Sequence, residues 1–329
     1  MEKQELKPQK LEVRYLKDDE RIRSRELYEE VFVEDADGFS ELYYKIKARD
    51  NRILVAENDG AIVSMLHRNP YTFRFRGASV PADYIVAVAT KVTCRHQGLM
   101  RALLTKALQD MYADGRPFTF LMPADEAIYT PFDFRLMGND DEEGLAAQGS
   151  EELEEDYELF VEKDEAYQKR HIDWPEWETT PMMLRLVDAA KFVGKIGAEE
   201  PQSLIVRVTD PILPENDGVF CWSFTEDSSR LTRSGAEPEF TISIADLGSF
   251  LFGMLGAEEL PGITKTAFQK LEQVRQTTEQ RLLVMQRQNA EKLDEMRGVV
   301  DEKLQRTLEE RMTQSFRLVN ERLEQVYKG

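Results

Sequence analysis

The stretch formed by residues 85–104 constrains the fold of this chain more than any other. It opens with an apolar run, residues 85–89, of the kind that forms a strand buried on both faces. It closes with apolar side chains at helical spacing, which predict a helix: Leu99, Met100, Leu103, Leu104 and Leu108. Arg95-His96-Gln97-Gly98 lies between them, where the strand has ended and the helix begins. The pattern predicts an α/β (α+β) protein built around this strand, turn and helix.

The turn at residues 95–98 has the chemistry of an anion site. The start of a helix exposes unpaired backbone N–H groups and the positive end of the helix dipole, which together bind a phosphate or pyrophosphate. Gly98 has no Cβ to keep an anion away from the backbone, and Arg95 and Arg101 add positive charge on either side. An ordinary strand–turn–helix with a surface arginine is the alternative, so the neighbouring segments have to decide.

Those segments resemble the GNAT family of acyl-CoA-dependent N-acetyltransferases. The shared order is a strand, Arg-x-x-Gly-x-Met, an amphipathic helix, a second strand at residues 118–122 and then Ile128-Tyr129. The family has Gly or Ala where this chain has Met100. With its bulky Met100, Arg-x-x-Gly-Leu-Met-Arg is most similar to the Eis-type branch, and the blocks at residues 63–67, 84–90 and 120–129 strengthen that match.

The resemblance implies a mixed sheet flanked by helices, acetyl-CoA as co-substrate and no metal. It also implies that the strand of residues 85–89 separates from its neighbour, so that the pantetheine arm of coenzyme A fills the gap like an extra strand. The residues expected to hold coenzyme A are Val86, Ala87 and Val88 along the pantetheine, and Arg95, His96, Gln97, Gly98, Leu99, Met100 and Arg101 around the pyrophosphate.

Two side chains are candidates for proton transfer. The resemblance places the family's general-acid tyrosine at Tyr129, which is protonated at neutral pH and can donate to a departing thiolate. The alternative is a core tyrosine with its hydroxyl at the surface. His67 is a candidate proton acceptor beside the substrate channel, although a lone histidine is more often structural. Asp125 and Glu126 either contact an amine or favour a helix N-terminus.

Four segments follow from composition and resemblance. Residues 1–138 form the GNAT domain, with strands expected at 11–15, 53–57, 61–66 and 73–80, helices at 18–33 and 42–47, and an Asn58-Asp59-Gly60 hairpin. Residues 139–180 are expected to be an acidic linker with a last strand at 157–163. Two interpretations of its acidic side chains are open: they keep a linker solvated, or they form a rim that attracts a cationic amine. Residues 181–262 resemble the sterol-carrier-like domain of Eis-type proteins, with a helix expected over 183–196 and strands at 204–208, 219–224 and 239–244.

The tail, residues 263–329, is expected to be a coiled-coil helix that mediates self-association. Its apolar residues recur at alternating steps of three and four, as in Leu293, Met296, Val300 and Leu304. The stretch from residue 292 onward resembles the coiled-coil region of the RmuC family of DNA recombination proteins, but the chain stops before that family's nuclease-like domain. A gene fusion and an assembly artefact are both open.

The composition limits the binding partners and the cellular compartment expected for the protein. The net charge of -19 argues against a non-specific nucleic-acid or anionic-membrane binder. Cys94 and Cys221 show no metal-ligand spacing and fit a reducing cytoplasm, and no apolar run is long enough to span a bilayer. The function expected is acetyl transfer to a small-molecule or peptide amine by direct attack on the thioester. The alternatives are a non-catalytic acyl-CoA sensor and a coiled-coil interaction protein with a GNAT remnant.

Overall fold

The computed structural model describes residues 11–33, 39–137, 159–171, 182–198 and 200–274. All of the described residues belong to one compact unit. Of the tail predicted as a coiled coil over residues 263–329, residues 275–329 and the whole RmuC-like stretch lie outside the described residues, whereas Ala267 and Leu271 pack in the core of the C-terminal sheet. Most of the expected acidic linker also lies outside them, at residues 138–158 and 172–181.

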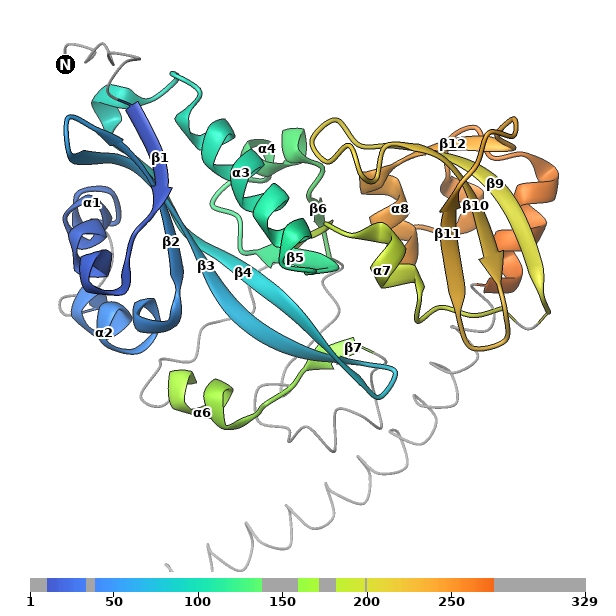
Figure 1. Ribbon diagram of the computed structural model, residues 1–329, viewed down its shortest axis with the longest axis horizontal. Coiled ribbons are helices and arrows are strands. Elements are labelled where there is room, and N and C mark those ends of the chain that lie inside the picture. The colour runs from blue at the N-terminus through green and yellow to red at the C-terminus, as the bar shows by residue number, and fades with distance from the viewer. Residues whose placement is uncertain (1–10, 34–38, 138–158, 172–181, 199, 275–329) are drawn as a thin grey trace, which may run out of the picture. The chain divides into compact units, whose positions relative to one another are not determined.

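Eight of the described strands form one mixed sheet (Figure 1). Its order is β1-β2-β3-β4-β5-β8-β6, and β7 pairs with the end of β3. All pairs are antiparallel except the parallel pair β4 and β5. The bounds are β1 Leu11–Tyr15, β2 Arg52–Asn58, β3 Ala61–Phe75, β4 Ala78–Thr90, β5 Phe118–Leu121, β6 Arg135–Leu136, β7 Leu159–Val161 and β8 Met183–Leu186.

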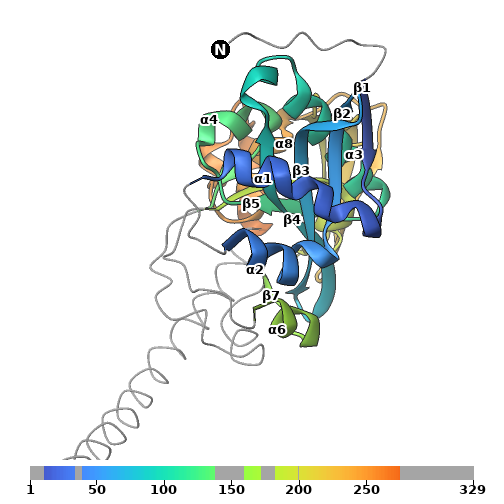
Figure 2. The same ribbon diagram turned by 90° about the vertical axis from the view of Figure 1, so that its left-hand side faces the viewer.

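Helices cover both faces of this sheet. A short 3-10 helix at Asp18–Ser24, α1 (Arg25–Val31) and α2 (Phe39–Ile46) lie on one face (Figure 2). Tyr28 and Tyr43 of these helices share a buried apolar cluster with residues of β2, β3 and β4. On the other face α3 (Leu99–Ala113) buries Leu103, Leu104 and Leu108. The predicted mixed sheet flanked by helices is confirmed. Within the described ranges, no helix is both long and apolar enough to cross a membrane.

Two tight turns connect β2, β3 and β4. The predicted hairpin at residues 58–60 is present, with Asp59 and Gly60 at φ 53° and 79°. A second turn at Arg76-Gly77, with φ 48° and 74°, was not predicted as a hairpin. The two segments expected at residues 61–66 and 73–80 therefore belong to a hairpin of two long strands. The polar residues between residues 66 and 73 do not interrupt β3. Their hydrogen bonds to β4 in the sheet outweigh their low intrinsic preference for a strand.

The helix predicted over residues 183–196 is wrong in its first half. Met183–Leu186 is the strand β8, which pairs with β5 on one side and β6 on the other. Only Ala189–Val193 forms a helix, α7, which Asp188 caps by accepting a hydrogen bond from the Lys191 N–H at 2.9 Å. Every residue of β8 is buried, so its side chains show no alternation, and a short apolar run of this kind does not distinguish a strand from a buried helix.

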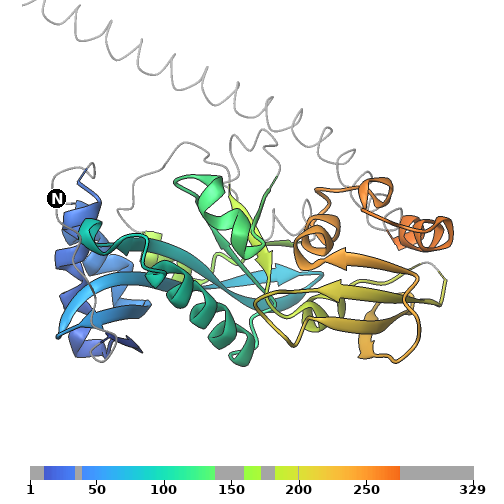
Figure 3. The same cartoon turned by 90° about the horizontal axis from the view of Figure 1, so that it is seen from above.

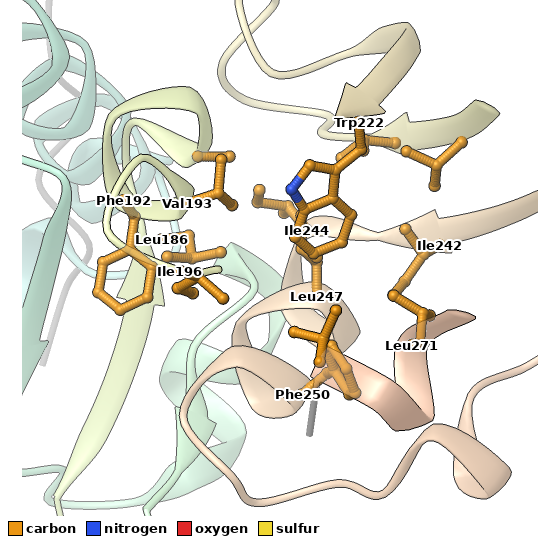
Figure 4. Packing of buried hydrophobic residues seen from close by; sticks show 14 of the residues in the cluster. Leu186, Phe192, Val193, Ile196, Trp222, Ile242, Ile244, Leu247, Phe250 and Leu271 are labelled. Carbon is orange, nitrogen blue, oxygen red and sulfur yellow. The ribbon is translucent and has the colours of Figure 1, made fainter. Parts of the chain in front are cut away.

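The C-terminal part of the described chain has its own four-stranded sheet in the order β11-β10-β9-β12. Its elements are β9 Gln202–Thr209, β10 Gly218–Phe224, β11 Ser229–Arg233, β12 Phe240–Ser243, α8 Ile244–Leu251 and a helix at residues 265–274. The orange helices pack on one side of these strands (Figure 3). Between them lie Trp222, Ile242, Leu247, Phe250 and Leu271, all buried (Figure 4). This interior is a packed apolar core.

A buried arginine joins the two sheets. Arg185 of β8 is 1% exposed and donates to the Phe132 carbonyl at 2.7 Å and to Asp210 Oδ1 at 2.8 Å. Asp210 also accepts from the backbone N–H groups of Ile212 and Leu213 and from the Asn216 side chain. Each charge in this pair therefore has a partner, which a buried charge requires.

We expect Asp210→Ala to lower the free energy of unfolding by about 3–5 kcal/mol, because it leaves the Arg185 guanidinium buried without its counter-charge. Urea unfolding followed by circular dichroism measures the loss. Asp217→Ala is the matched control: its pair with Arg207 is more than a third exposed, so a loss below about 1 kcal/mol is expected. Equal losses in the two variants would show that the buried pair does not hold the two sheets together.

Candidate functional site

Strands β4 and β5 separate part of the way along the sheet. They pair at only three positions, Asp83 with Thr119, Tyr84 with Phe120 and Ile85 with Leu121. β5 ends at Leu121, whereas β4 continues along β3 as far as Thr90. Among the described residues, no strand pairs with residues 86–90 on the side that β5 has left. Buried main-chain groups require partners, so this opening suits a ligand that lies along β4.

The closed end of the opening is held by buried polar groups. Arg68 of β3 pairs with Asp83 at 2.5 Å and reaches Asp114, just after α3, at 2.8 Å. The Thr119 hydroxyl donates to the Asp83 carbonyl at 2.7 Å, across the parallel pair. These bonds fix where pairing of β4 and β5 begins, so the position of the opening is set by the frame of the sheet.

A β-bulge lies in β4 where the opening begins. Met65 pairs with Ala89 and His67 with Val86, so Ala87 and Val88 together face Leu66 alone. Ala87 has φ 52°, an uncommon value for a residue with a Cβ. The bulge sends Val86 and Ala87 to the face of α1 and α2 and Val88 to the face of α3. Bulges re-aim side chains and main-chain groups beside sites, as this one does at three of the predicted coenzyme A residues.

The predicted anion turn stands at the start of α3. His96 and Gly98 have φ 63° and 78°, and Gly98 is the N-cap of the helix. A Cβ added at Gly98 would meet no atom within 4 Å, so the space in front of the backbone is open.

The side chains of this turn divide into two groups. Those of Arg95, His96, Gln97 and Arg101 are exposed, whereas Leu99 is buried in the core and Met100 packs against it. The guanidinium of Arg101 lies over the ring of Phe132, 4.9 Å from its centroid. Leu99 and Met100 therefore offer an anion only their backbone N–H groups, while the arginines offer charge.

Tyr129 is the last residue of α4 (Glu126–Tyr129), whose N-terminus Asp125 caps through the Ala127 N–H at 2.9 Å. Of the two roles considered for Asp125, the helix-capping one is confirmed. Tyr129 is 6% exposed, and burial raises the pKa of its phenol to about 12. Burial likewise raises the pKa of Tyr84 to about 12, with a smaller increase from Tyr129 and a hydrogen bond from the Met122 backbone opposing it. The Met122 backbone therefore donates to the Tyr84 hydroxyl across the edge of the opening.

A cavity of about 400 Å³ lies against the opening on the face of α1 and α2. Val86, Tyr84 and Met122 belong both to its wall and to the edges of the opening. The remaining described wall residues come from α1, α2, β3, β5, β7, α6 (Glu165–His171) and the residues beside them: Tyr28, Phe39, Tyr43, Lys47, Asn69, Tyr71, Phe120, Val161, Tyr167 and Met182. A bound molecule in this cavity would lie next to a ligand placed along β4.

His67 lies behind the cavity wall, fully buried. Its Nδ1 is hydrogen bonded to the Tyr43 hydroxyl at 2.9 Å, and Asn51 Nδ2 donates to the same hydroxyl at 3.1 Å. The other ring nitrogen of His67, Nε2, is buried and has no hydrogen-bond partner among the described residues. Burial lowers the pKa of His67 to about 3. This position argues against the predicted role of His67 as proton acceptor and for a role in holding Tyr43.

Sequence reasoning missed most of the cavity. The rings of Tyr71, Tyr84 and Phe120 lie on three adjacent strands, where alternating residues share one face, so their clustering was a detectable signal once β3 was extended. Lys47 and Tyr167 gave no such signal, because their approach depends on how α2 and α6 pack. Among the described residues, no group of three or more His, Cys, Asp and Glu side chains is arranged to hold a metal ion.

Comparisons with known proteins agree with this geometry. Residues 12–137 match the family model of the acetyltransferase (GNAT) domain, and residues 186–284 match that of the sterol carrier protein domain. None of the curated proteins matches the chain.

Solved structures share the fold of both parts. A probable N-acyltransferase of Enterococcus faecalis V583 has a TM-score of 0.62 at 12% identity, over 80% of this chain and 96% of that one. A GCN5-related N-acetyltransferase from Kribbella flavida has a TM-score of 0.62 at 14% identity, over 80% and 95%. Eis1 from Mycobacterium abscessus has a TM-score of 0.60 at 15% identity, over 80% of this chain and 96% of that one. The two family models confirm the predicted GNAT acetyltransferase domain and sterol-carrier-like domain, and the solved structures support the Eis-like resemblance at the level of fold alone.

The pKa of His67 predicts a pH dependence of stability. Between its unfolded value of about 6.5 and its folded value of about 3, the unfolded chain binds a proton that the folded chain does not, so stability falls as the pH falls. We expect this group to remove about 2 kcal/mol between pH 7 and pH 5. His67→Gln should lose less stability than the parent over that interval, measured by urea unfolding at both pH values. An unchanged loss of stability in His67→Gln would contradict the assignment.

Proposed function

We propose that the protein is an acetyl-CoA-dependent N-acetyltransferase in which an acceptor amine attacks the thioester directly. The observation that carries this proposal is the opening between β4 and β5, which has an anion turn at the start of α3 and a small-molecule cavity beside it. An elongated ligand with a pyrophosphate at one end and a reactive group at the other fits such an arrangement.

Coenzyme A would be held mainly by main-chain groups. The amides at the start of α3 and the charges of Arg95 and Arg101 would bind the pyrophosphate. The pantetheine amides would pair with Val86, Ala87 and Val88, whose strand has no partner there among the described residues. The bulge at Ala87 would direct main-chain N–H groups at the thioester oxygen, where negative charge develops during attack.

The reaction needs no covalent enzyme intermediate. The lone pair of the neutral amine attacks the thioester carbon, the C–N bond forms, the C–S bond breaks, and coenzyme A leaves as a thiolate. Tyr129 would give its proton to the sulfur and recover one from solvent, while the acetylated nitrogen loses one proton to solvent. Because the pKa of Tyr129 is raised to about 12, the phenol keeps its proton throughout the neutral range.

The acceptor would occupy the cavity, since Val86 and Met122 line both it and the opening. This places the amine beside the thioester and leaves the body of the acceptor against the aromatic wall. The sterol-carrier-like part would serve as a support: its Asp210 accepts from Arg185, which donates to the Phe132 carbonyl, three residues after Tyr129.

We expect Gly98→Ala to raise the KM for acetyl-CoA about tenfold with little change in kcat. A Cβ at φ 78° strains the turn and projects into the space proposed for the pyrophosphate. Steady-state thiol release with varied acetyl-CoA measures both constants. Gly60→Ala is the matched control, because Gly60 has φ 79° and equally open surroundings but lies in the β2–β3 hairpin. A similar change in KM in both variants would mean that strain alone, and no anion site, is responsible.

Tyr129→Phe is expected to lower kcat by about 10²-fold or more, because the departing thiolate loses its proton donor. The variant should still bind coenzyme A, which isothermal titration calorimetry checks. Tight binding without turnover in the parent protein would instead favour an acyl-CoA sensor. Unchanged turnover in Tyr129→Phe would remove the general-acid assignment and leave the binding site intact.

A further inference from the structure

Tyr84 lies where the cavity meets the opening between β4 and β5. Building on the proposed acetyl transfer, on which this inference rests, we propose that Tyr84 orients the acceptor amine for attack: its hydroxyl oxygen accepts a hydrogen bond from an amine N–H. Tyr129 then serves the departing sulfur alone. Four features of Tyr84 support this role: the face of the sheet on which it lies, its level along the strand, its fixed ring and the chemistry of its hydroxyl.

The two phenols beside the opening lie on opposite faces of the sheet. Side chains alternate along β4, so Tyr84 and Val86 share one face, and both line the cavity. Ile85 between them points to the other face, where it belongs to the apolar cluster that packs against α3. Tyr129 belongs to that same cluster. An amine bound in the cavity therefore lies on the side of Tyr84, whereas Tyr129 approaches the thioester from the opposite side.

The register of the sheet places the Tyr84 hydroxyl close to the proposed thioester. The last pair of β4 and β5 comes one residue before Met122, so Met122 follows at the level of Val86. The Met122 backbone donates to the Tyr84 hydroxyl, which therefore reaches that level too. The bulge at Ala87, where the thioester oxygen is proposed to bind, begins one residue further on, at a rise of about 3.3 Å per residue. An amine between the two can contact both.

Aromatic neighbours hold the ring of Tyr84 in place. Its centroid lies 5.2 Å from that of Phe120 on β5 and 6.1 Å from that of Tyr71 on β3. The rings of Phe120 and Tyr71 are themselves 5.5 Å apart. Three rings from three adjacent strands thus restrict one another. A hydroxyl on a restricted ring orients a ligand with little further loss of side-chain freedom on binding.

An uncharged phenol suits an amine that must attack without a proton. Of the described groups, the Met122 backbone is the one that is hydrogen bonded to the Tyr84 hydroxyl, so the oxygen can also accept an N–H of a ligand. Burial raises the pKa of Tyr84 to about 12, which keeps the hydroxyl neutral throughout the neutral range. A carboxylate in this place would instead favour the ammonium form of the acceptor, which has no lone pair for attack.

The kinetics of Tyr84→Phe test the proposal with the full chain. Phenethylamine, spermidine, triglycine and kanamycin are offered with acetyl-CoA, and the amine with the highest kcat/KM for the parent protein is then used. We expect Tyr84→Phe to lower kcat/KM for this amine about tenfold, because the amine N–H loses its acceptor. The KM for acetyl-CoA, and the Kd of coenzyme A measured by calorimetry, should change less than about twofold.

Tyr112→Phe is the matched control. Tyr112 is a partly buried tyrosine near the end of α3, outside the opening and the described wall of the cavity, so its variant should leave all of these constants unchanged. Phenylalanine at position 84 keeps the ring that packs on Phe120 and Tyr71, so Tyr84→Phe should melt at the temperature of the parent.

A double variant separates contact with the amine from support of Tyr129. If Tyr84 contacts the amine and Tyr129 the sulfur, the losses in Tyr84→Phe and Tyr129→Phe multiply. A double variant no slower than Tyr129→Phe would show that Tyr84 acts only through Tyr129. That result, an unchanged kcat/KM for the amine in Tyr84→Phe, or an equal rise of the KM for acetyl-CoA would overturn the proposal while acetyl transfer stands. If the parent acetylates none of the four amines, or does not bind coenzyme A, the proposed function itself fails.

Discussion

The structure depends on a strand pair that stops early. β4 stays paired with β3 as far as Thr90, whereas β5 ends at Leu121. The pairing of β4 with β5 therefore stops while β4 continues. The main chain of residues 86–90 is thereby left without a strand partner on one side among the described residues. Unpaired main-chain groups inside a protein are costly, and a ligand with amide groups of its own satisfies them. The turn, Tyr129 and the cavity all lie beside this opening.

Buried charges keep the opening in place. Arg68 holds Asp83 where β4 and β5 are still paired, and Arg185 connects β8 to the Phe132 carbonyl and to Asp210. Such pairs are strongly destabilising to break, because either partner alone is a buried uncompensated charge. The Arg68–Asp83 pair lies at the closed end of the opening, and Arg185 bonds the main chain three residues after Tyr129. The position of the site is therefore set by these buried pairs of the sheets.

The same frame explains why ionisable groups in the site stay neutral. Burial raises the pKa of both Tyr84 and Tyr129 to about 12 and lowers that of His67 to about 3. Two phenols that retain protons and an imidazole that does not take one suit a reaction in which a neutral amine attacks and a thiolate leaves. His67 contributes indirectly, through its hydrogen bond to the Tyr43 hydroxyl on the cavity wall.

Much of the architecture was predictable from local pattern. The helix that begins at Leu99, the strand at residues 118–121, the hairpin at residues 58–60 and the capping by Asp125 all follow from periodicity, turn residues and capping chemistry. The wrong helix over Met183–Leu186 has a physical origin: its partners β5 and β6, which decide that the segment is a strand, are distant in sequence.

The sequence by itself determined the strand, turn and helix of residues 85–104. The spacing of the apolar residues, the glycine in the turn and the chemistry of a helix start all depend on residues that are neighbours in the chain. Only the tertiary structure decided that β5 leaves β4 after three pairs, that His67 is buried behind Tyr43, and that Lys47 lies among aromatic rings. These depend on which distant segments pack together, and burial, which sets pKa and charge environment, has no local signature in a chain.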